Sequence, residues 1–423
     1  MKKRMLIVLA IFVVVASFAF AGGASEKPKT NEIVMWTFLD PTSTTNGRGI
    51  ALGKMIKEFE ADNPGAKVTV EVKNYATMTG EFLTAHAAGN APDIIWCARD
   101  ELSGVLDAGA LEPLENLFLG EWSAEEIDDV DDAFFRFGER GGKHYTLTLN
   151  KNALVMFYRS DLLKAAGHTV PKTWDQIVAA ARDMTKTEGG ITTYGLGQSF
   201  PSGYSDPQLL ANWLIEKQGT LFDKDGRAMW ANPVGVSGVN WVVDAIRKGY
   251  TPESSINLGT EDIIAEFQAG KYGMFIAGAV RVGAIKAAAS YDPNFVKVMD
   301  LPGGCIIDGW FAGIWSKSKN KDLAGRFLEK MYSPQADLYW INDGDQAPVR
   351  KSSIDKITIT ESNDYLTVML DAFANGWITP NDKSYAGWKI NLNEAIQRVV
   401  ANGLDPMVAL QQTADEFNAA NGR

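Results

Sequence analysis

The chain has 423 residues, more than one hydrophobic core usually supports, so we expect two domains or lobes. Hydrophobic residues make up 46% and charged residues 22%, which is typical of a globular protein and excludes a disordered or fibrous one. The formal net charge is -11 and becomes -14, with 38 basic and 52 acidic residues, once a leader carrying Lys2, Lys3 and Arg4 is removed. Because phosphate binding needs clustered lysine and arginine, this balance argues against nucleic acid and favours a neutral or cationic partner, or a protein.

Residues 1–21 have the three parts of a secretory signal peptide. A basic start precedes an apolar run from Met5 to Phe20, and Ala19-Phe20-Ala21 forms a small-x-small cleavage site. An uncleaved anchor helix is the alternative, but about 16 apolar residues are short for a membrane span. No cysteine follows the apolar run, so we expect no lipobox. The mature protein is therefore expected in the periplasm, with residues 22–30 as a flexible leader.

Cysteine and histidine are too sparse for a structural framework. An exported protein with only Cys97 and Cys305 does not depend on disulfides, although these two could pair. The three histidines, His86, His144 and His168, lack the spacing of metal ligands. We therefore expect no metal site and no cofactor.

Strand and helix patterns alternate through the N-terminal part of the chain. Apolar residues recur at helical spacing in residues 46–60, and residues 67–72 alternate as in a strand. The order β-α-β-α-β predicts a parallel sheet with helices on both faces. The expected elements are strands at 32–38, 67–72 and 93–96 and helices at 46–60, 79–88 and 102–111, followed by an acidic, solvated segment at 121–132.

The alternation continues in the C-terminal part. Thr173 is the expected N-cap of a helix that runs to Met184, and Trp213 and Trp241 are interpreted as core residues of later helices. Residues 223–226 resemble the start of a calcium loop but lack its later acidic positions, so we expect a hairpin turn. The expected elements are strands at 145–150 and 153–159 and helices at 173–184, 209–215 and 239–246.

The stretch from Gly89 to Asp100 places an aromatic and charges where a buried strand must end. Turn residues precede the apolar run 94–96, and Trp96 and Asp100 lie at its exit. Ligands of open α/β sheets bind outside the carboxyl ends of the strands, which makes both residues candidate ligand contacts. The alternative is a buried tryptophan and an aspartate that begins a helix.

Catalytic signatures are absent from the sequence. Gly195-Leu196-Gly197 lacks the third glycine of a dinucleotide fingerprint, and Gly270-Lys271 lacks the upstream glycine and the following Ser/Thr of a phosphate loop. No Gly-x-Ser-x-Gly elbow occurs. Carboxylates are plentiful, so a secreted glycoside hydrolase stays open as an alternative.

A series of short motifs runs through the mature chain in a fixed order. They are FEADNPG at 59–65, GNAPDII at 89–95, DAGALEPL at 107–114, GKHY at 142–145, YRSDLL at 158–163 with PKTWD at 171–175, FQAGKYGM at 267–274, LPGG at 301–304, the segment 317–328, and APVRKS at 347–352. In their order and spacing these motifs resemble the extracellular solute-binding proteins of bacterial ABC importers, in the carbohydrate-binding family that includes maltose-binding protein.

The resemblance implies an α/β fold of two lobes, each a sheet flanked by helices, with a ligand cleft at the hinge. Lobe 1 would comprise residues 31–147 plus 312–352, and lobe 2 residues 148–311 plus 353–423. Such proteins close by hinge bending when a ligand touches both lobes. The closed form would then be recognised by the transmembrane subunits of an ABC permease.

The resemblance also implies ligand contacts. Asp40 and Asp100 match hydroxyl-binding carboxylates of the family, Asn152 takes the place of a third carboxylate, and Trp388 matches an aromatic that stacks on a sugar ring. Asp40 could instead be a cap or turn residue.

The chain departs from the family pattern at several positions. Cys97 stands where a tryptophan is expected, with Trp96 one place earlier. Glu101 replaces the arginine expected after Asp100, although Arg99 precedes Asp100 and is a candidate ligand contact. Val280 and Val282, with Arg281 between them, replace aromatics, so we expect a ligand other than maltose.

Further candidate contacts are Asp308 and Trp310 at the second expected crossing, Tyr204 after a glycine-rich loop, and Trp36 near the exit of the first strand. The alternatives are hinge packing for Trp310, surface exposure for Tyr204 and core packing for Trp36.

The sequence thus favours a monomeric extracytoplasmic receptor without catalysis, which binds a mono- or oligosaccharide and delivers it to an ABC permease. A polyol or a glycerol phosphate ester is the alternative ligand. A secreted glycoside hydrolase and an adhesive surface protein are alternatives of other classes.

Overall fold

Strands and helices alternate from the start of the structure, in the order that the sequence predicts. The computed structural model describes residues 31–130, 132–200, 208–361, 363–380, 382–385 and 387–423, so the expected signal peptide and leader lie outside it. Strand β1 pairs in parallel with both β2 and β3, which confirms the predicted parallel sheet. These first elements are β1 (Glu32–Thr37), α2 (Gly47–Asp62), β2 (Lys67–Val72), α3 (Met78–Ala88) and β3 (Ile94–Ala98).

Strand β6 (Thr146–Arg159) is one continuous strand of 14 residues. The prediction of two strands, 145–150 and 153–159, is wrong at this point. The polar pair Lys151-Asn152 interrupts the apolar pattern, but the backbone stays extended because β6 pairs antiparallel with β11 (Ile306–Ile314) along this stretch. Long-range pairing therefore overrides the local sequence pattern.

The two long strands join the strands of both lobes into one sheet, which has ten strands in the part of the chain that the structure describes. Along the main path the order is β2-β1-β3-β11-β6-β9-β8-β7, while β10 pairs with β6 and β12 with β11. The N-terminal part of β6 pairs with β11, and its C-terminal part pairs with β9 and β10. The remaining strands are β7 (Lys186–Glu188), β8 (Ile191–Leu196), β9 (Tyr272–Gly278), β10 (Val296–Met299), β12 (Trp377–Ile378) and a separate hairpin of β4 (Glu139–Arg140) and β5 (Lys143–His144).

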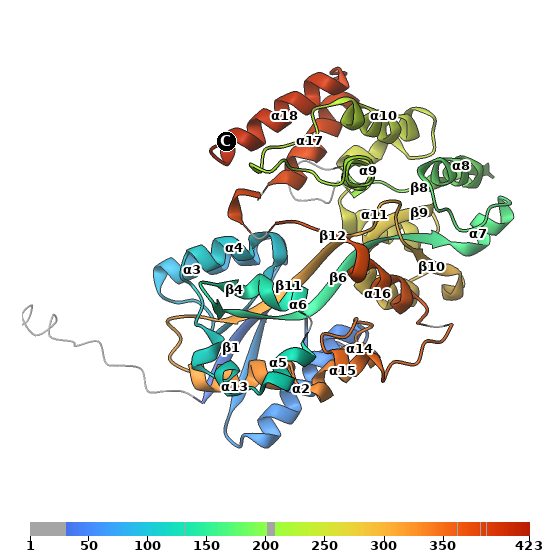
Figure 1. Cartoon of the computed structure of the whole chain (residues 1–423). Helices are drawn as coiled ribbons and strands as arrows, with labels where there is room; N and C mark the ends of the chain where they lie inside the picture. The colour runs from blue at the N-terminus through green and yellow to red at the C-terminus, as the bar shows by residue number, and fades with distance from the viewer. Residues whose placement is uncertain (1–30, 131, 201–207, 362, 381, 386) are drawn as a thin grey trace, which may run out of the picture.

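Two lobes follow from this arrangement, and Figure 1 shows β6 and β11 running between them. We call the elements around β1, β2 and β3 the first lobe and those around β8 and β9 the second lobe. The expected α/β fold of two lobes is confirmed. In addition, one hydrogen-bonded sheet passes through both lobes. The residue boundaries of the lobes stay a prediction.

Helices cover both lobes. Thr173 caps α8 as predicted, since its Oγ1 accepts a hydrogen bond from the backbone N of Gln176 at 3.3 Å. In the first lobe the helices are α4 (Arg99–Asp107), α5 (Ala124–Asp129), α6 (Asp132–Phe135), α13 (Lys321–Met331), α14 (Pro334–Asn342) and α15 (Lys351–Ile354). In the second lobe they are α7 (Ser160–Ala165), α8 (Trp174–Met184), α9 (Gln208–Gln218), α10 (Pro233–Arg247), α11 (Thr260–Gln268), α12 (Val282–Ala287), α16 (Tyr365–Asn375), α17 (Trp388–Val400) and α18 (Pro406–Ala420). Single turns of 3-10 helix lie at Leu114–Asn116, Leu119–Glu121, Arg136–Gly138, Glu253–Asn257, Ala279–Arg281, Pro293–Phe295 and Lys383–Tyr385.

The two cysteines lie in the interior of the protein. Cys97 and Cys305 are free and buried, and burial raises the pKa of both thiols, so they stay protonated at neutral pH. Among the described residues, no cluster of three or more His, Cys, Asp or Glu side chains is placed to hold a metal ion. Within the same part of the chain, no helix has the length and apolar character that crossing a bilayer requires.

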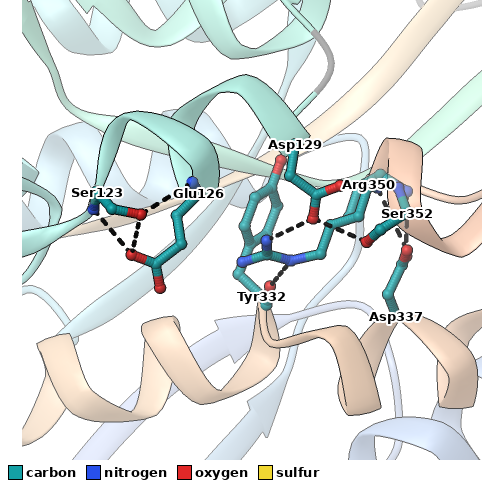
Figure 2. Close-up of polar contacts among 8 residues, drawn as sticks. Ser123, Glu126, Asp129, Tyr332, Asp337, Arg350 and Ser352 are labelled. Atoms are coloured by element: carbon teal, nitrogen blue, oxygen red, sulfur yellow. Dashed lines mark hydrogen bonds and ion pairs between the residues drawn. The ribbon is translucent and has the colours of Figure 1, made fainter.

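The acidic segment 121–132, expected to be solvated and without evident chemistry, contributes to a buried network in the first lobe. Figure 2 shows Arg350 at its centre. The Arg350 guanidinium donates to Asp129 Oδ2 at 2.9 Å and to the Tyr332 carbonyl at 2.7 Å, and its side chain is only 6% exposed. Asp129 also accepts from Ser352, and Asp337 accepts from the backbone N of Arg350. The network thereby fastens the segment that follows α14 to helix α5.

Candidate ligand-binding cleft

A cleft of about 520 Å³ lies between the two lobes. The two long strands form its floor, the first lobe one wall and the second lobe the other. Its size falls within the ~300–1,000 Å³ that is common for small-molecule sites in proteins.

The floor owes its composition to the alternation of side chains along a strand. Asp308 and Trp310 of β11 and Asn152 and Leu154 of β6 all line the cleft, because side chains two apart on a strand share a face. Asp308 lies directly opposite Asn152 in the ladder. The register shifts between Trp310 and Phe311, a bulge or similar irregularity beside the cleft, and the pairing then continues to Gly313.

A row of aromatic rings leads from the core of the first lobe to the floor. Trp310 packs against Phe38 with ring centroids 4.5 Å apart, and Phe38 meets Trp96 edge-on at 5.8 Å. Trp96 is buried and contacts Trp340 in turn. Only Phe38 and Trp310 reach the cleft, so Trp96 supports the aromatic surface from behind.

The wall of the first lobe is polar and partly cationic. Arg48 comes from the first turn of α2, and Lys73, Asn74 and Tyr75 follow β2. Lys73 Nζ lies 4.0 Å from the ring centroid of Trp36. All of these wall residues follow a strand or begin a helix, which is where parallel sheets place ligand contacts.

The wall of the second lobe brings Glu261 and Arg281 to the cleft. Arg281 forms an ion pair with Glu261 at 2.5 Å. The Tyr75 hydroxyl of the first lobe lies 3.3 Å from Glu261 Oε1, so a direct contact joins the two walls. A ligand in the cleft would therefore touch both lobes.

A second contact between the lobes lies beside the floor. Lys389 of α17 forms an ion pair with Asp100 of α4 at 2.7 Å and lies 3.8 Å from Asp308. Arg99 is buried, donates to the Thr379 carbonyl and lies over the Phe137 ring. Burial lowers the pKa of Arg99.

Comparison with known proteins decides the family. The sequence profile of the bacterial extracellular solute-binding protein family matches residues 54–367, well over half of the chain. The chain belongs to this family. The family binds solutes and is not enzymatic, which sets aside the glycoside hydrolase alternative.

Relatives within this solute-binding family have low sequence identity to the chain but match most of its length. The maltodextrin-binding protein MdxE of Bacillus subtilis is 24% identical over 343 residues, 77% of this chain and 76% of that protein. A binding protein of Brucella abortus is 27% identical over 304 residues, 70% of this chain and 71% of that protein.

Solved structures share the fold. A solute-binding protein of Thermotoga lettingae bound with α-D-tagatose has a TM-score of 0.80 at 21% identity, covering 92% of this chain and 99% of that chain. The GacH receptor of Streptomyces glaucescens, solved unliganded and with acarbose, has a TM-score of 0.79 at 19% identity, covering 92% and 97%. These likenesses show that the chain has the α/β fold of periplasmic binding proteins.

The structure places some of the candidate contacts predicted from the sequence in the cleft and others outside it. Three of them, Asn152, Asp308 and Trp310, line the cleft. Asp100 and Arg99 lie in the contact between lobes described above. Tyr204 lies outside the described residues.

The other candidates lie elsewhere. Asp40 is exposed and forms a turn, since its Oδ1 accepts from the backbone N and the hydroxyl of Thr42. These hydrogen bonds lower the pKa of Asp40. Trp36 is half-buried under Lys73, and Trp388 is buried against Trp377. Trp96 is likewise buried, behind Phe38.

Several cleft residues were not singled out as candidate contacts from the sequence, among them Phe38, Arg48, Tyr75 and Glu261. Phe38 could have been found, because it follows the first strand directly. The other three need the packing of distant segments. Arg281 was noted only as a departure from the family pattern, and the structure gives it a place on the wall.

Gly278 sets the position of a floor residue and supplies a first prediction. A Cβ added at Gly278 would lie 2.5 Å from Asn152 Nδ2, so Gly278→Ala must displace the carboxamide. Asn152 lines the cleft, and its buried Oδ1 has no hydrogen-bond partner within the part of the chain that the structure describes. Losing one hydrogen bond of about 1 kcal/mol should weaken ligand binding roughly fivefold, measured by calorimetry. Gly80→Ala is the control, because a Cβ there meets nothing within 4 Å. Equal affinity of both variants would contradict this role of Asn152.

Proposed function

We propose that this protein is the extracytoplasmic receptor of an ABC importer and binds a mono- or oligosaccharide in the cleft between its lobes. The observation that carries the proposal is the floor of the cleft. An indole face at Trp310 stands beside an amide at Asn152 and a carboxylate at Asp308. A sugar ring has an apolar face that suits the indole and hydroxyl groups that suit the polar atoms.

Proteins with the same fold support a sugar-like ligand without deciding which. The Thermotoga lettingae structure holds α-D-tagatose, and an Agrobacterium radiobacter structure with a TM-score of 0.78 holds ribitol. A polyol offers hydroxyls but no rigid ring face. The tilted pair of Phe38 and Trp310 therefore favours a cyclic sugar over a polyol.

The proposed working cycle uses the geometry of the two walls. Ligand would favour the arrangement in which Tyr75 meets Glu261, because only there does it touch both walls at once. The lobes would comprise residues 31–147 plus 312–352 and 148–311 plus 353–423. Residues 1–21 would direct export to the periplasm, and the closed protein would dock on permease subunits as a monomer.

A thermal-shift screen tests the proposal. Neutral sugars from mono- to trisaccharides, acidic sugars, polyols and glycerol phosphate would each be added to the purified mature chain. A bound sugar at a hundred times its Kd should stabilise the protein by about 2.7 kcal/mol, seen as a higher melting temperature. The proposal is wrong if polyols or glycerol phosphate stabilise the protein and no sugar of any kind does.

A further inference from the structure

The cleft carries more positive charge than the acidic chain as a whole would suggest. Arg48 and Lys73 of the first lobe and Arg281 of the second line it, against the carboxylates of Glu261 and Asp308. Most of these charges are paired. Lys73 lies 3.1 Å from Glu71, Arg281 pairs with Glu261, and Asp308 lies near Lys389.

Arg48 is the exception. Within the described part of the chain its side chain forms no hydrogen bond and no ion pair, and its guanidinium lies 5.5 Å from the ring centroid of Phe38. Burial and the neighbouring charge of Arg281 lower the pKa of Arg48 to about 10 against the opposing charge of Glu261, so Arg48 remains charged at neutral pH. A partly buried guanidinium beside a second guanidinium is stabilised by an anion between them, and the Glu261 carboxylate bonds directly to Arg281 but not to Arg48.

We propose that the ligand is an anionic saccharide, whose carboxylate or phosphate group binds between Arg48 and Arg281 while its ring lies on Trp310. The inference rests on the proposed function and specifies its ligand class. Guanidinium groups bind such oxyanions through paired hydrogen bonds, and these two come from opposite lobes. One anionic group would therefore hold both walls of the cleft.

The carboxylate of Glu261 does not prevent an anionic ligand from binding between Arg48 and Arg281. Its side chain is 51% exposed, so its pair with Arg281 is screened by solvent and contributes little to stability. A ligand anion can replace the Glu261 carboxylate on Arg281 and at the same time form a direct ion pair with Arg48, which Glu261 influences only at longer range. The acidic surface elsewhere is no obstacle either, because charges farther than about 10 Å are screened at ordinary ionic strength.

Calorimetry with matched ligands tests the inference. Glucuronate and galacturonate, their oligomers, and the 6-phosphates of glucose and galactose would be compared with the neutral sugars of the same ring. We expect an acidic sugar to bind at least about tenfold more tightly than its neutral counterpart. The uronate and phosphate series show which anion the two arginines accept.

Variants locate the effect. Arg48→Gln should reduce affinity for the acidic sugar about tenfold and leave that for a neutral sugar unchanged, and Arg281→Gln provides a second, independent test. Arg247→Gln, at an exposed position at the end of α10, removes the same charge and should change neither affinity. Circular dichroism checks that each variant is folded.

The outcomes separate the two proposals. If a neutral sugar binds as tightly as its acidic counterpart, or if both arginine variants keep the preference for the acidic sugar, the inference is wrong and the saccharide receptor stands. If no sugar of either charge binds, the proposed function fails and the inference with it.

Discussion

Arg350→Ala is expected to lower the free energy of unfolding by about 3 kcal/mol. The substitution removes a nearly buried cation that bonds Asp129 and the Tyr332 carbonyl, and it leaves the Asp129 carboxylate without its ion pair in a site only 19% exposed (Figure 2). The guanidinium also lies 5.3 Å from the ring centroid of Trp122, a contact that alanine cannot make. Urea unfolding followed by circular dichroism measures the loss.

The adjacent Lys351 offers a matched control for this prediction. Its ion pair with Asp128 is 3.5 Å long, and the two side chains are 48% and 84% exposed. Exposed pairs contribute about 0–1 kcal/mol, so Lys351→Ala should change stability by less than about 0.5 kcal/mol. Similar losses in the two variants would contradict the role given to Arg350.

Lower pH should reduce the difference in the free energy of unfolding between the wild type and Arg350→Ala. Burial alone would raise the pKa of Asp129, but hydrogen bonds from Arg350 and Ser352 outweigh it and lower that pKa below its ordinary value. A carboxyl group with a lowered folded-state pKa stabilises the fold above its unfolded pKa of about 3.9, and the contribution disappears as pH falls through the folded-state value. Unfolding curves at pH 7 and at about pH 3 should therefore show a smaller effect of the substitution in acid.

Trp310→Ala is expected to reduce affinity for the ligand by about 2–3 kcal/mol, roughly 30- to 150-fold. The indole lies on the floor of the cleft and is held against Phe38, so it offers a fixed flat surface to a sugar ring. Alanine removes that surface and leaves Phe38 exposed to water. Calorimetric titration with the best sugar of the screen measures the loss.

Trp310→Phe and Trp241→Phe make the test specific. Phenylalanine at position 310 retains a smaller ring and should recover part of the affinity. Trp241 packs against Trp174 and Trp213, away from the cleft, so its replacement should lower stability without changing affinity. The stacking role is refuted if Trp310→Ala binds the ligand as tightly as the wild type.

The order of strands and helices could be predicted from the sequence because it depends on local periodicity. The pairing of distant strands could not. The polar residues Lys151 and Asn152 divide what the structure shows to be one strand, and only the partner strand β11 explains why the backbone stays extended there. Those polar side chains mark the place where the strand passes the cleft.

Some residues of the candidate cleft could be predicted from the sequence, and others could not because they depend on long-range packing. The floor residues Asn152, Asp308 and Trp310 were found from family positions and from the expected crossing. Trp96 has the features of a ligand contact in the sequence, but one residue determines which face of a strand a side chain takes, and it lies in the core. Arg48 gives no local signal, since only the folded chain brings it near Arg281 and Glu261 of the second lobe. Net charge does not indicate the cationic side chains of the cleft, because it averages over the whole chain.

The two strands that bridge the lobes also carry the residues that would meet the ligand. Any twist of one lobe against the other has to bend β6 and β11, which cross between the lobes, and so changes how Asn152 and Asp308 stand relative to the two walls. A molecule that fits the floor and both walls at once thereby selects one angle between the lobes. Ligands of slightly different shape would then leave the protein at slightly different angles, and a permease that reads the angle could accept one bound sugar and reject another.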